Sequence, residues 1–238
     1  RSWKFESSPG HQSRRNHQDN QMKRVIPQPV GFGFFGFCIG VSASETHSMK
    51  NTKMSTSEAQ ERIIAMAKET MSAGKLVQAS VQSAFGCGFE GKIDEEKVLS
   101  IVKRYLEAGV RNISLADTAG MGNPAQVERL FTAIKEIDQD VTLACHFHNT
   151  YGMGLANVIT AMRCGVTYIE SAFGGLGGCP FTKSPSGNVC TEDLVYMLQE
   201  MGMREDVDMH KIIGVANYLS GFLMRDLPGY VYKLKSNK

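Results

Sequence analysis

The fold is decided by the run Val141-Thr142-Leu143-Ala144-Cys145-His146-Phe147-His148-Asn149, an apolar stretch that ends in two histidines. The apolar part predicts a buried strand over residues 141–146. Residues two apart on a strand point to the same side, so His146 and His148 can offer two imidazoles to one point. A His-x-His pair alone is weak evidence for a metal, because either ring could simply satisfy backbone groups at the strand end.

A glycine-rich phrase follows further along the chain and adds to that pair. It reads Gly174-Gly175-Leu176-Gly177-Gly178-Cys179-Pro180, and Ser186-Gly187-Asn188 comes shortly after it. These glycines could simply form a turn without any functional role. We interpret the phrase as a mobile loop that carries one thiol and one amide acceptor toward the histidines, which together suggest a metal-assisted active site. No helix start follows these glycines, so a dinucleotide-binding Rossmann motif is discounted.

Strand and helix patterns alternate along most of the chain. Ser55 with Glu58 predicts a capping box, Asp94 predicts a second helix start, and Asn123-Pro124 predicts a third. The expected strands cover residues 34–42, 76–80, 111–115, 141–146 and 167–171, and the expected helices include 55–72, 95–108, 191–201 and 208–224. Five βα units with near-continuous apolar strands indicate an α/β fold built on a parallel sheet.

Polar side chains gather where these strands end. They are Glu45, Gln82, Asp117, His146, His148 and Ser171. In βα-barrels and doubly wound sheets the functional site lies at the C-terminal edge of the strands. Each residue alone could cap a loop, but their recurrence at successive strand ends predicts a site at this edge.

Composition is that of an ordinary globular protein. The chain has 238 residues, 42% of them hydrophobic and 21% charged, with a net charge of +2. This balance calls for neither nucleic acid nor an anionic membrane, and no apolar stretch reaches the ~20 residues of a membrane span. The six cysteines form no CxxC pair, which favours a reducing, intracellular compartment. Cys38 and Cys145 sit in apolar runs and are expected to pack in the core.

The N-terminal residues differ from the rest of the chain. Residues 1–30 are polar and basic and show no helical or strand period, which predicts a disordered tail. A targeting presequence is the other interpretation, because the segment contains Ser and Arg and few acids. The expected domain organisation is this tail followed by one domain over residues 31–238.

Several motifs together resemble one enzyme family. The glycine-cysteine phrase from Gly174, Ser186-Gly187-Asn188 and the run Thr191-Glu192-Asp193-Leu194 closely resemble the signature of 3-hydroxy-3-methylglutaryl-CoA (HMG-CoA) lyases. His146-Phe147-His148-Asn149-Thr150-Tyr151-Gly152 and Ser114-Leu115-Ala116-Asp117-Thr118 are similar to other motifs of that family. The resemblance covers about residues 36–224.

The resemblance implies a fold, a reaction and a set of site residues. The fold is a TIM (β/α) barrel, and the reaction is metal-assisted retro-aldol cleavage of HMG-CoA, or a related 3-hydroxyacyl-CoA, to acetyl-CoA and acetoacetate. The implied ligands of Mg²⁺ or Mn²⁺ are His146, His148 and Asn188. The implied catalytic residues are the loop thiol Cys179 and two acids, Asp117 and Glu192. The implied compartment is the cytoplasm or the mitochondrial matrix.

The chain departs from the family pattern at one point. The family begins with a strand that carries an Arg-Asp pair, whose Asp binds the metal, and no such strand precedes residue 36. We therefore expect an incomplete barrel of about five of eight βα units, with two open sheet edges that leave room for a homodimer. Two imidazoles and one amide oxygen predict weak binding of Mg²⁺, a preference for Mn²⁺ or Zn²⁺, and little or no lyase activity from this chain alone.

Three hypotheses about function follow. The first is an HMG-CoA lyase, the second is another acyl-CoA enzyme of the same metal barrels, such as a 2-isopropylmalate synthase type, and the third is a non-catalytic remnant. The glycine-cysteine loop favours the lyase over the synthase, and release of acetyl-CoA from a hydroxyacyl-CoA would distinguish them.

Overall fold

The computed structural model describes residues 36–178 and 187–235. The expected N-terminal tail and Cys179 lie outside these residues. Within them no helix is long and apolar enough to cross a membrane.

Five parallel strands form the single sheet of the described chain. They are β1 (Gly36–Ser42), β2 (Leu76–Gln82), β3 (Asn112–Asp117), β4 (Thr142–Phe147) and β5 (Tyr168–Glu170). Their order in the sheet is their order in the chain, and every pairing is parallel. This confirms the predicted alternation. Each crossover carries a helix, so all C-terminal strand ends meet at one edge.

Helices follow the strands as the sequence predicts, with caps that explain where they begin. The helices that cover or extend the sheet are α2 (Glu45–Thr52), α3 (Thr56–Ser72), α4 (Glu95–Glu107), α5 (Pro124–Ile137), α6 (Gly154–Arg163), α7 (Thr191–Glu200), α8 (Met209–Phe222) and α9 (Val231–Lys235). The hydroxyl of Ser55 accepts from the amide of Glu58 at 3.1 Å, and the carboxylate of Asp94 accepts from the amide of Glu96 at 3.1 Å. These side chains satisfy amides that have no partner inside the helix.

Three helix assignments from the sequence need correction. The short helix α2 was not expected, and it begins at Ser44, whose hydroxyl accepts from the amide of His47. Thr191 is the expected cap of the helix that ends at 201, but it is the first residue of α7, and the cap is Cys190, whose side chain makes no capping bond. The helix expected to be last, α8, is followed by α9.

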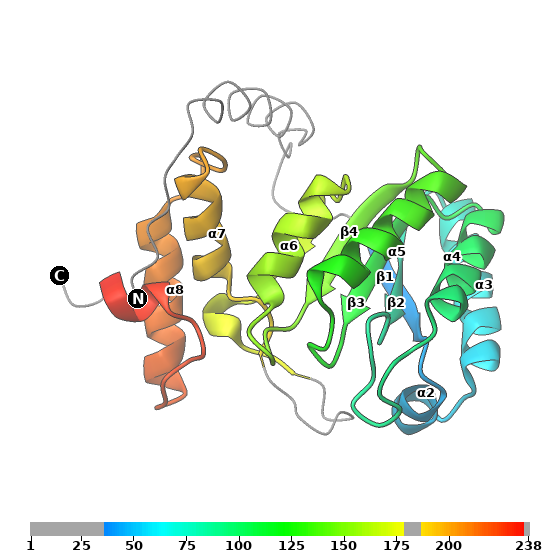
Figure 1. The fold of residues 1–238 in the computed structure, drawn as a ribbon, viewed down its shortest axis with the longest axis horizontal. Helices are drawn as coiled ribbons and strands as arrows, with labels where there is room; N and C mark the ends of the chain where they lie inside the picture. Colours follow the sequence, from blue (N-terminus) through cyan, green and yellow to red (C-terminus); the bar gives the residue numbers. More distant parts are fainter. Residues whose placement is uncertain (1–35, 179–186, 236–238) are drawn as a thin grey trace, which may run out of the picture. The chain divides into compact units, whose positions relative to one another are not determined.

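The two faces of the strands differ in chemistry, which corrects the expectation of near-continuous apolar strands. On β2, Val77, Ala79 and Val81 are buried on one face, and Gln78 and Gln82 alternate with them. Helices α3 and α4 pack against β2, as Figure 1 shows for the row of helices beside the sheet. The apolar positions therefore build the core between sheet and helices, and the polar positions face the other side.

The sheet curls strongly about its polar face. The side-chain amide of Gln78 on β2 donates to the carboxylate of Glu170 on β5 at 2.8 Å. On a flat sheet these two strands would lie about 14 Å apart, three strand spacings of about 4.8 Å each. Both side chains can meet only because the strands bend toward one another, as the wall of a barrel does.

Candidate active site

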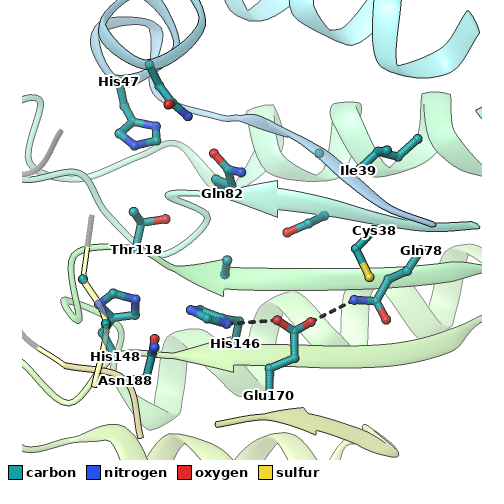
Figure 2. A pocket seen from close by; sticks show the side chains of 16 residues that line it. Cys38, Ile39, His47, Gln78, Gln82, Thr118, His146, His148, Glu170 and Asn188 are labelled. Carbon is teal, nitrogen blue, oxygen red and sulfur yellow. Dashed lines mark hydrogen bonds and ion pairs between the residues drawn. The ribbon is translucent and has the colours of Figure 1, made fainter. Parts of the chain in front are cut away.

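A cavity of about 500 Å³ opens at the C-terminal end of the strands, on the polar face. Residues from all five strands, from α2 and from the segment after the glycine-rich loop line it, and Figure 2 labels ten of them. Its described lining includes His47, Gln82, Thr118, His146, His148 and Asn188. The structure thus places the candidate site at the edge where the sequence predicts it.

His146 and His148 both face this cavity. The centres of their rings lie 5.3 Å apart, and His148 is 5% exposed (Figure 2). The period of two along β4 puts both rings on the polar side of the sheet, as expected. The separation is compatible with one nitrogen from each ring reaching a single cation.

Asn188 reaches the histidines through backbone pairing. Its backbone forms an isolated antiparallel bridge with His148. On either side of that bridge, the amide of Val189 donates to the carbonyl of Phe147 at 2.9 Å, and the amide of Asn149 donates to the carbonyl of Gly187 at 3.1 Å. The chain that returns from the glycine-rich loop is therefore fastened beside the end of β4.

The side chain of Asn188 has one oxygen that no described residue satisfies. Its Nδ2 donates to the carbonyl of Leu176 at 2.8 Å, which assigns the orientation of the amide. Its Oδ1 is buried and has no hydrogen-bond partner among residues 36–178 and 187–235. A buried oxygen without a donor is costly unless a ligand satisfies it. Oδ1 is therefore available for a cation held by the two rings.

The donor set fits a divalent cation with a preference for nitrogen. His146, His148 and Asn188 supply two imidazoles and one neutral oxygen, which suit Mn²⁺ or Zn²⁺ better than Mg²⁺. In the described part of the chain, no group of three or more His, Cys, Asp or Glu side chains could hold a metal. The candidate site therefore has no carboxylate ligand within that part.

Glu170 is a residue of this site that sequence reasoning missed. Its Oε2 lies 3.0 Å from Nδ1 of His146, and its Oε1 accepts from Gln78 at 2.8 Å and from Ser114 at 3.2 Å. Burial opposes its ionisation, but the hydrogen bonds from His146, Gln78 and Ser114 outweigh burial and hold the pKa of Glu170 below its usual range. A charged carboxylate thus sits behind the first of the two histidines.

Asp117 lies on the other face of its strand. It is fully buried, and its two carboxylate oxygens accept from the backbone amides of Met121 and Gly122, both at 2.9 Å. Burial raises the pKa of Asp117 to about 6, although these backbone bonds act in the opposite direction. Asp117 is not among the described residues that line the cavity. In this geometry it holds the loop that leads into α5.

Glu192 also lies behind the cavity rather than in it. It is fully buried on the first turn of α7, and both of its oxygens accept from the amide of Gly174 at 2.9 Å. The thiol of Cys190 donates to Oε2 at 2.8 Å. Glu192 therefore fastens the first residue of the glycine-rich loop, whose thiol, Cys179, lies outside the described residues.

The other polar strand-end residues are divided between the cavity and the loops. Gln82 lines the cavity. The carboxylate of Glu45 instead accepts from the amide of Thr56 at 3.1 Å, and Ser171 shares a hydrogen bond of 2.9 Å with Thr191.

Two further lining residues depart from what the sequence indicates. Cys38 was expected in the core, but it is exposed on β1 and lines the cavity, while Cys145 is fully buried as expected. His47 on α2 lines the cavity opposite His148, and burial, countered in part by Glu90, lowers its pKa (Figure 2). The sequence did not mark either residue as part of a site. Cys38 lies in an apolar strand run but faces the cavity, and His47 lies on a helix whose residues show no apolar period.

Comparisons with known proteins agree with this geometry. A family model described as HMGL-like matches residues 30–219. A hydroxymethylglutaryl-CoA lyase of Bacillus subtilis is 37% identical over 87% of this chain and 69% of its own length. The mitochondrial hydroxymethylglutaryl-CoA lyase of Homo sapiens is 39% identical over 77% of this chain and 57% of its own length. The chain thus spans somewhat more than half to about two thirds of these relatives.

Solved structures with the same arrangement include enzymes of this type. An HMG-CoA lyase from Acinetobacter baumannii, in complex with coenzyme A and 3-methylmalate, has a TM-score of 0.78 and is 38% identical over 84% of this chain and 66% of its own. A carboxyl transferase domain of pyruvate carboxylase from Rhizobium etli matches with a TM-score of 0.56 at 20% identity, which shows a shared fold only. The five-stranded sheet is therefore part of a TIM-barrel architecture.

Proposed function

This chain belongs to the HMGL-like family, and on that premise we propose that it carries the metal-binding side of a carbon–carbon lyase site for HMG-CoA or a close 3-hydroxyacyl-CoA. The observation that carries the proposal is the convergence of His146, His148 and the unsatisfied Oδ1 of Asn188 on one cavity. The products are acetyl-CoA and acetoacetate. The proposed cation is Mn²⁺ or Mg²⁺, of which the two imidazoles favour Mn²⁺, and these three side chains would hold it.

The reaction is a retro-aldol cleavage, whose atoms balance without a further reactant. The tertiary hydroxyl gives its proton to an acid–base group of the site, the adjacent carbon–carbon bond breaks, and the electron pair of that bond enters the enolate of the thioester. That enolate takes up a proton to become acetyl-CoA, and the other product keeps the new carbonyl. A bound divalent cation would supply polarisation of the hydroxyl and of the neighbouring substrate oxygens.

The chain's own residues would position the substrate and move protons. We assign the donation of a proton to the enolate to the thiol of Cys179, which lies outside the described residues. Asp117 and Glu192 remain proposed acids of the site. Their described contacts favour an action through the two loops that they fasten, the loop before α5 and the glycine-rich loop.

The proposal also covers the substrate carrier and the compartment. The Acinetobacter baumannii enzyme was solved with coenzyme A, which supports an acyl-CoA as the substrate of this chain. Relatives carry the names mitochondrial and cytoplasmic, and both compartments agree with the reducing environment that the cysteines indicate. A homodimer remains part of the proposal.

An exchange of segments tests the function. Residues 36–235 of this chain would replace the matching part of the Bacillus subtilis lyase, and acetyl-CoA release from HMG-CoA would be followed chromatographically with and without Mn²⁺. We expect metal-dependent release that disappears in a His148→Ala version. A folded hybrid that releases no acetyl-CoA would overturn the proposal. The prediction that the 238-residue chain alone turns over little substrate stays a prediction, and the same assay on that chain tests it.

A further inference from the structure

A polar network runs beneath the candidate metal site and links four strands through one carboxylate. Glu170 on β5 contacts His146 on β4, Ser114 on β3 and Gln78 on β2. Figure 2 shows His146 and Gln78 on the polar face of their strands, and Ser114 reaches the same carboxylate from β3. Glu170 belongs to the last strand of the described sheet, and its side chain is the point where these strands are joined.

Each bond in the network restricts the next one. Gln78 is 5% exposed and Ser114 is 1% exposed, so both side chains have little room to move. Both donate to Oε1 of Glu170, which leaves Oε2 directed at Nδ1 of His146, 3.0 Å away. A charged carboxylate can only accept, so Nδ1 must carry the proton. In the neutral ring the other nitrogen, Nε2, is then bare and available as an acceptor or a ligand.

We propose that Glu170 is the positioning residue of the site: it fixes the tautomer and the ring orientation of His146 so that a bare Nε2 is presented to the cation. The inference rests on the proposed function in one respect, the presence of a cation. Metal-binding histidines commonly give their second ring proton to a carboxylate, and loss of that partner typically costs 10–100-fold in metal affinity. In the described part of the chain no three His, Cys, Asp or Glu side chains are placed to hold a metal together, so Glu170 does not form such a group with His146 and His148, and we assign it an action through His146.

The first test reads the tautomer of His146 in the metal-free 238-residue chain. Two-bond ¹H–¹⁵N spectra distinguish a protonated ring nitrogen from a bare one. We expect the wild type to show the Nδ1–H form of His146, and Glu170→Ala to shift the ring toward the Nε2–H form or a mixture. An unchanged Nδ1–H form in Glu170→Ala would overturn the proposal. This readout needs no metal, so it stands even if the chain binds none.

The second test measures Mn²⁺ affinity by titration calorimetry. Glu170→Ala should bind Mn²⁺ 10–100-fold more weakly than the wild type, at an unchanged stoichiometry. Glu136→Gln, which alters an exposed glutamate of α5, should bind as the wild type does. Equal affinity of Glu170→Ala and the wild type would contradict the positioning role, whereas a wild type without any Mn²⁺ binding would contradict the proposed function instead.

A third variant keeps the test open if Glu170→Ala does not fold. Glu170→Asp retains the charge but is shorter by one methylene, roughly 1.5 Å, and cannot span the distance to His146. We expect a folded chain with the same change of tautomer and the same direction of change in Mn²⁺ affinity. Wild-type tautomer and affinity in Glu170→Asp would show that charge near the ring suffices, and would overturn the assignment of a positioning contact.

Discussion

Asn188 and His148 pair through their backbones in an isolated antiparallel bridge, although the glycine-rich loop lies between them in the chain. This bridge places the side-chain oxygen of Asn188 in the cavity that the two imidazoles line. The site is therefore built from the end of β4 and the segment that returns from the glycine-rich loop. The position of Asn188 depends on its contacts with that loop.

Replacing Gly177 tests whether the glycine-rich loop positions Asn188, and it alters none of the three proposed metal ligands. The backbone of Gly177 has a φ of 99°, and a Cβ at that position would lie 2.5 Å from Nδ2 of Asn188. We expect Gly177→Ala to displace the amide and to lower Mn²⁺ affinity about tenfold, in the range seen when the supporting contacts of a metal site are lost. The measurement is titration calorimetry with Mn²⁺.

Gly152→Ala is the matched control for that variant. Gly152 has a similar positive φ of 75°, but a Cβ there would meet nothing within 4 Å. It therefore reproduces the backbone strain without the clash. Equal Mn²⁺ affinities in the two variants would mean that strain alone explains the effect and that Gly177 has no role in placing Asn188.

Asp117 should make stability depend on pH in a defined direction. Its pKa of about 6 in the folded chain lies above the value of about 3.9 expected when it is unfolded. Between these pH values the folded state holds a proton that the unfolded state has released, so the free energy of unfolding falls as pH rises from 4 to 6. The loss is about 3 kcal/mol at most.

Urea unfolding at pH 4 and pH 7 measures this contribution. The fall in unfolding free energy between the two pH values should be smaller in Asp117→Asn than in the wild type. Asp140→Asn, at an exposed aspartate after α5, should retain the wild-type fall. A fall of the same size in all three chains would show that Asp117 does not titrate between these limits.

Cys179 should be required for cleavage but not for folding. We expect Cys179→Ala, made in the hybrid lyase, to lose nearly all release of acetyl-CoA while its thermal midpoint stays within a few degrees of the parent. Cys164→Ala, at the half-buried end of α6, is the control and should keep its activity. Release of acetyl-CoA at the parent's rate by Cys179→Ala would remove this thiol from the mechanism.

Much of the fold could be predicted because its signals are local. Apolar runs marked the strands, and caps such as Ser55 and Asp94 marked where helices begin. Helix α2 was missed because its residues show no apolar period, and its start depends on a Ser44 hydroxyl that is also bonded to Cys87. Contacts over such distances in the chain leave no trace in a short window of sequence.

The site was predictable only in part for the same reason. His146 and His148 share one strand, and their period of two places both rings on the same face. Glu170 was taken as part of a buried strand, because nothing near it in the chain reveals that the curl of the sheet brings it to Gln78. Asp117 also stands at a strand end, but its carboxylate accepts from the amide of Gly122 and Asp117 is not among the described residues that line the cavity, so its role as an acid of the site stays a prediction.

The most direct test of the account is Mn²⁺ binding by the purified 238-residue chain, followed by the electron paramagnetic resonance signal of free Mn²⁺. The central claim is that His146, His148 and Asn188 form one site. The wild type should bind one Mn²⁺ per chain, and replacing any one of the three residues by Ala should weaken binding at least tenfold. His210→Ala, on α8 and outside the cavity lining, should bind as the wild type does. Wild-type affinity in all three alanine variants would contradict the account.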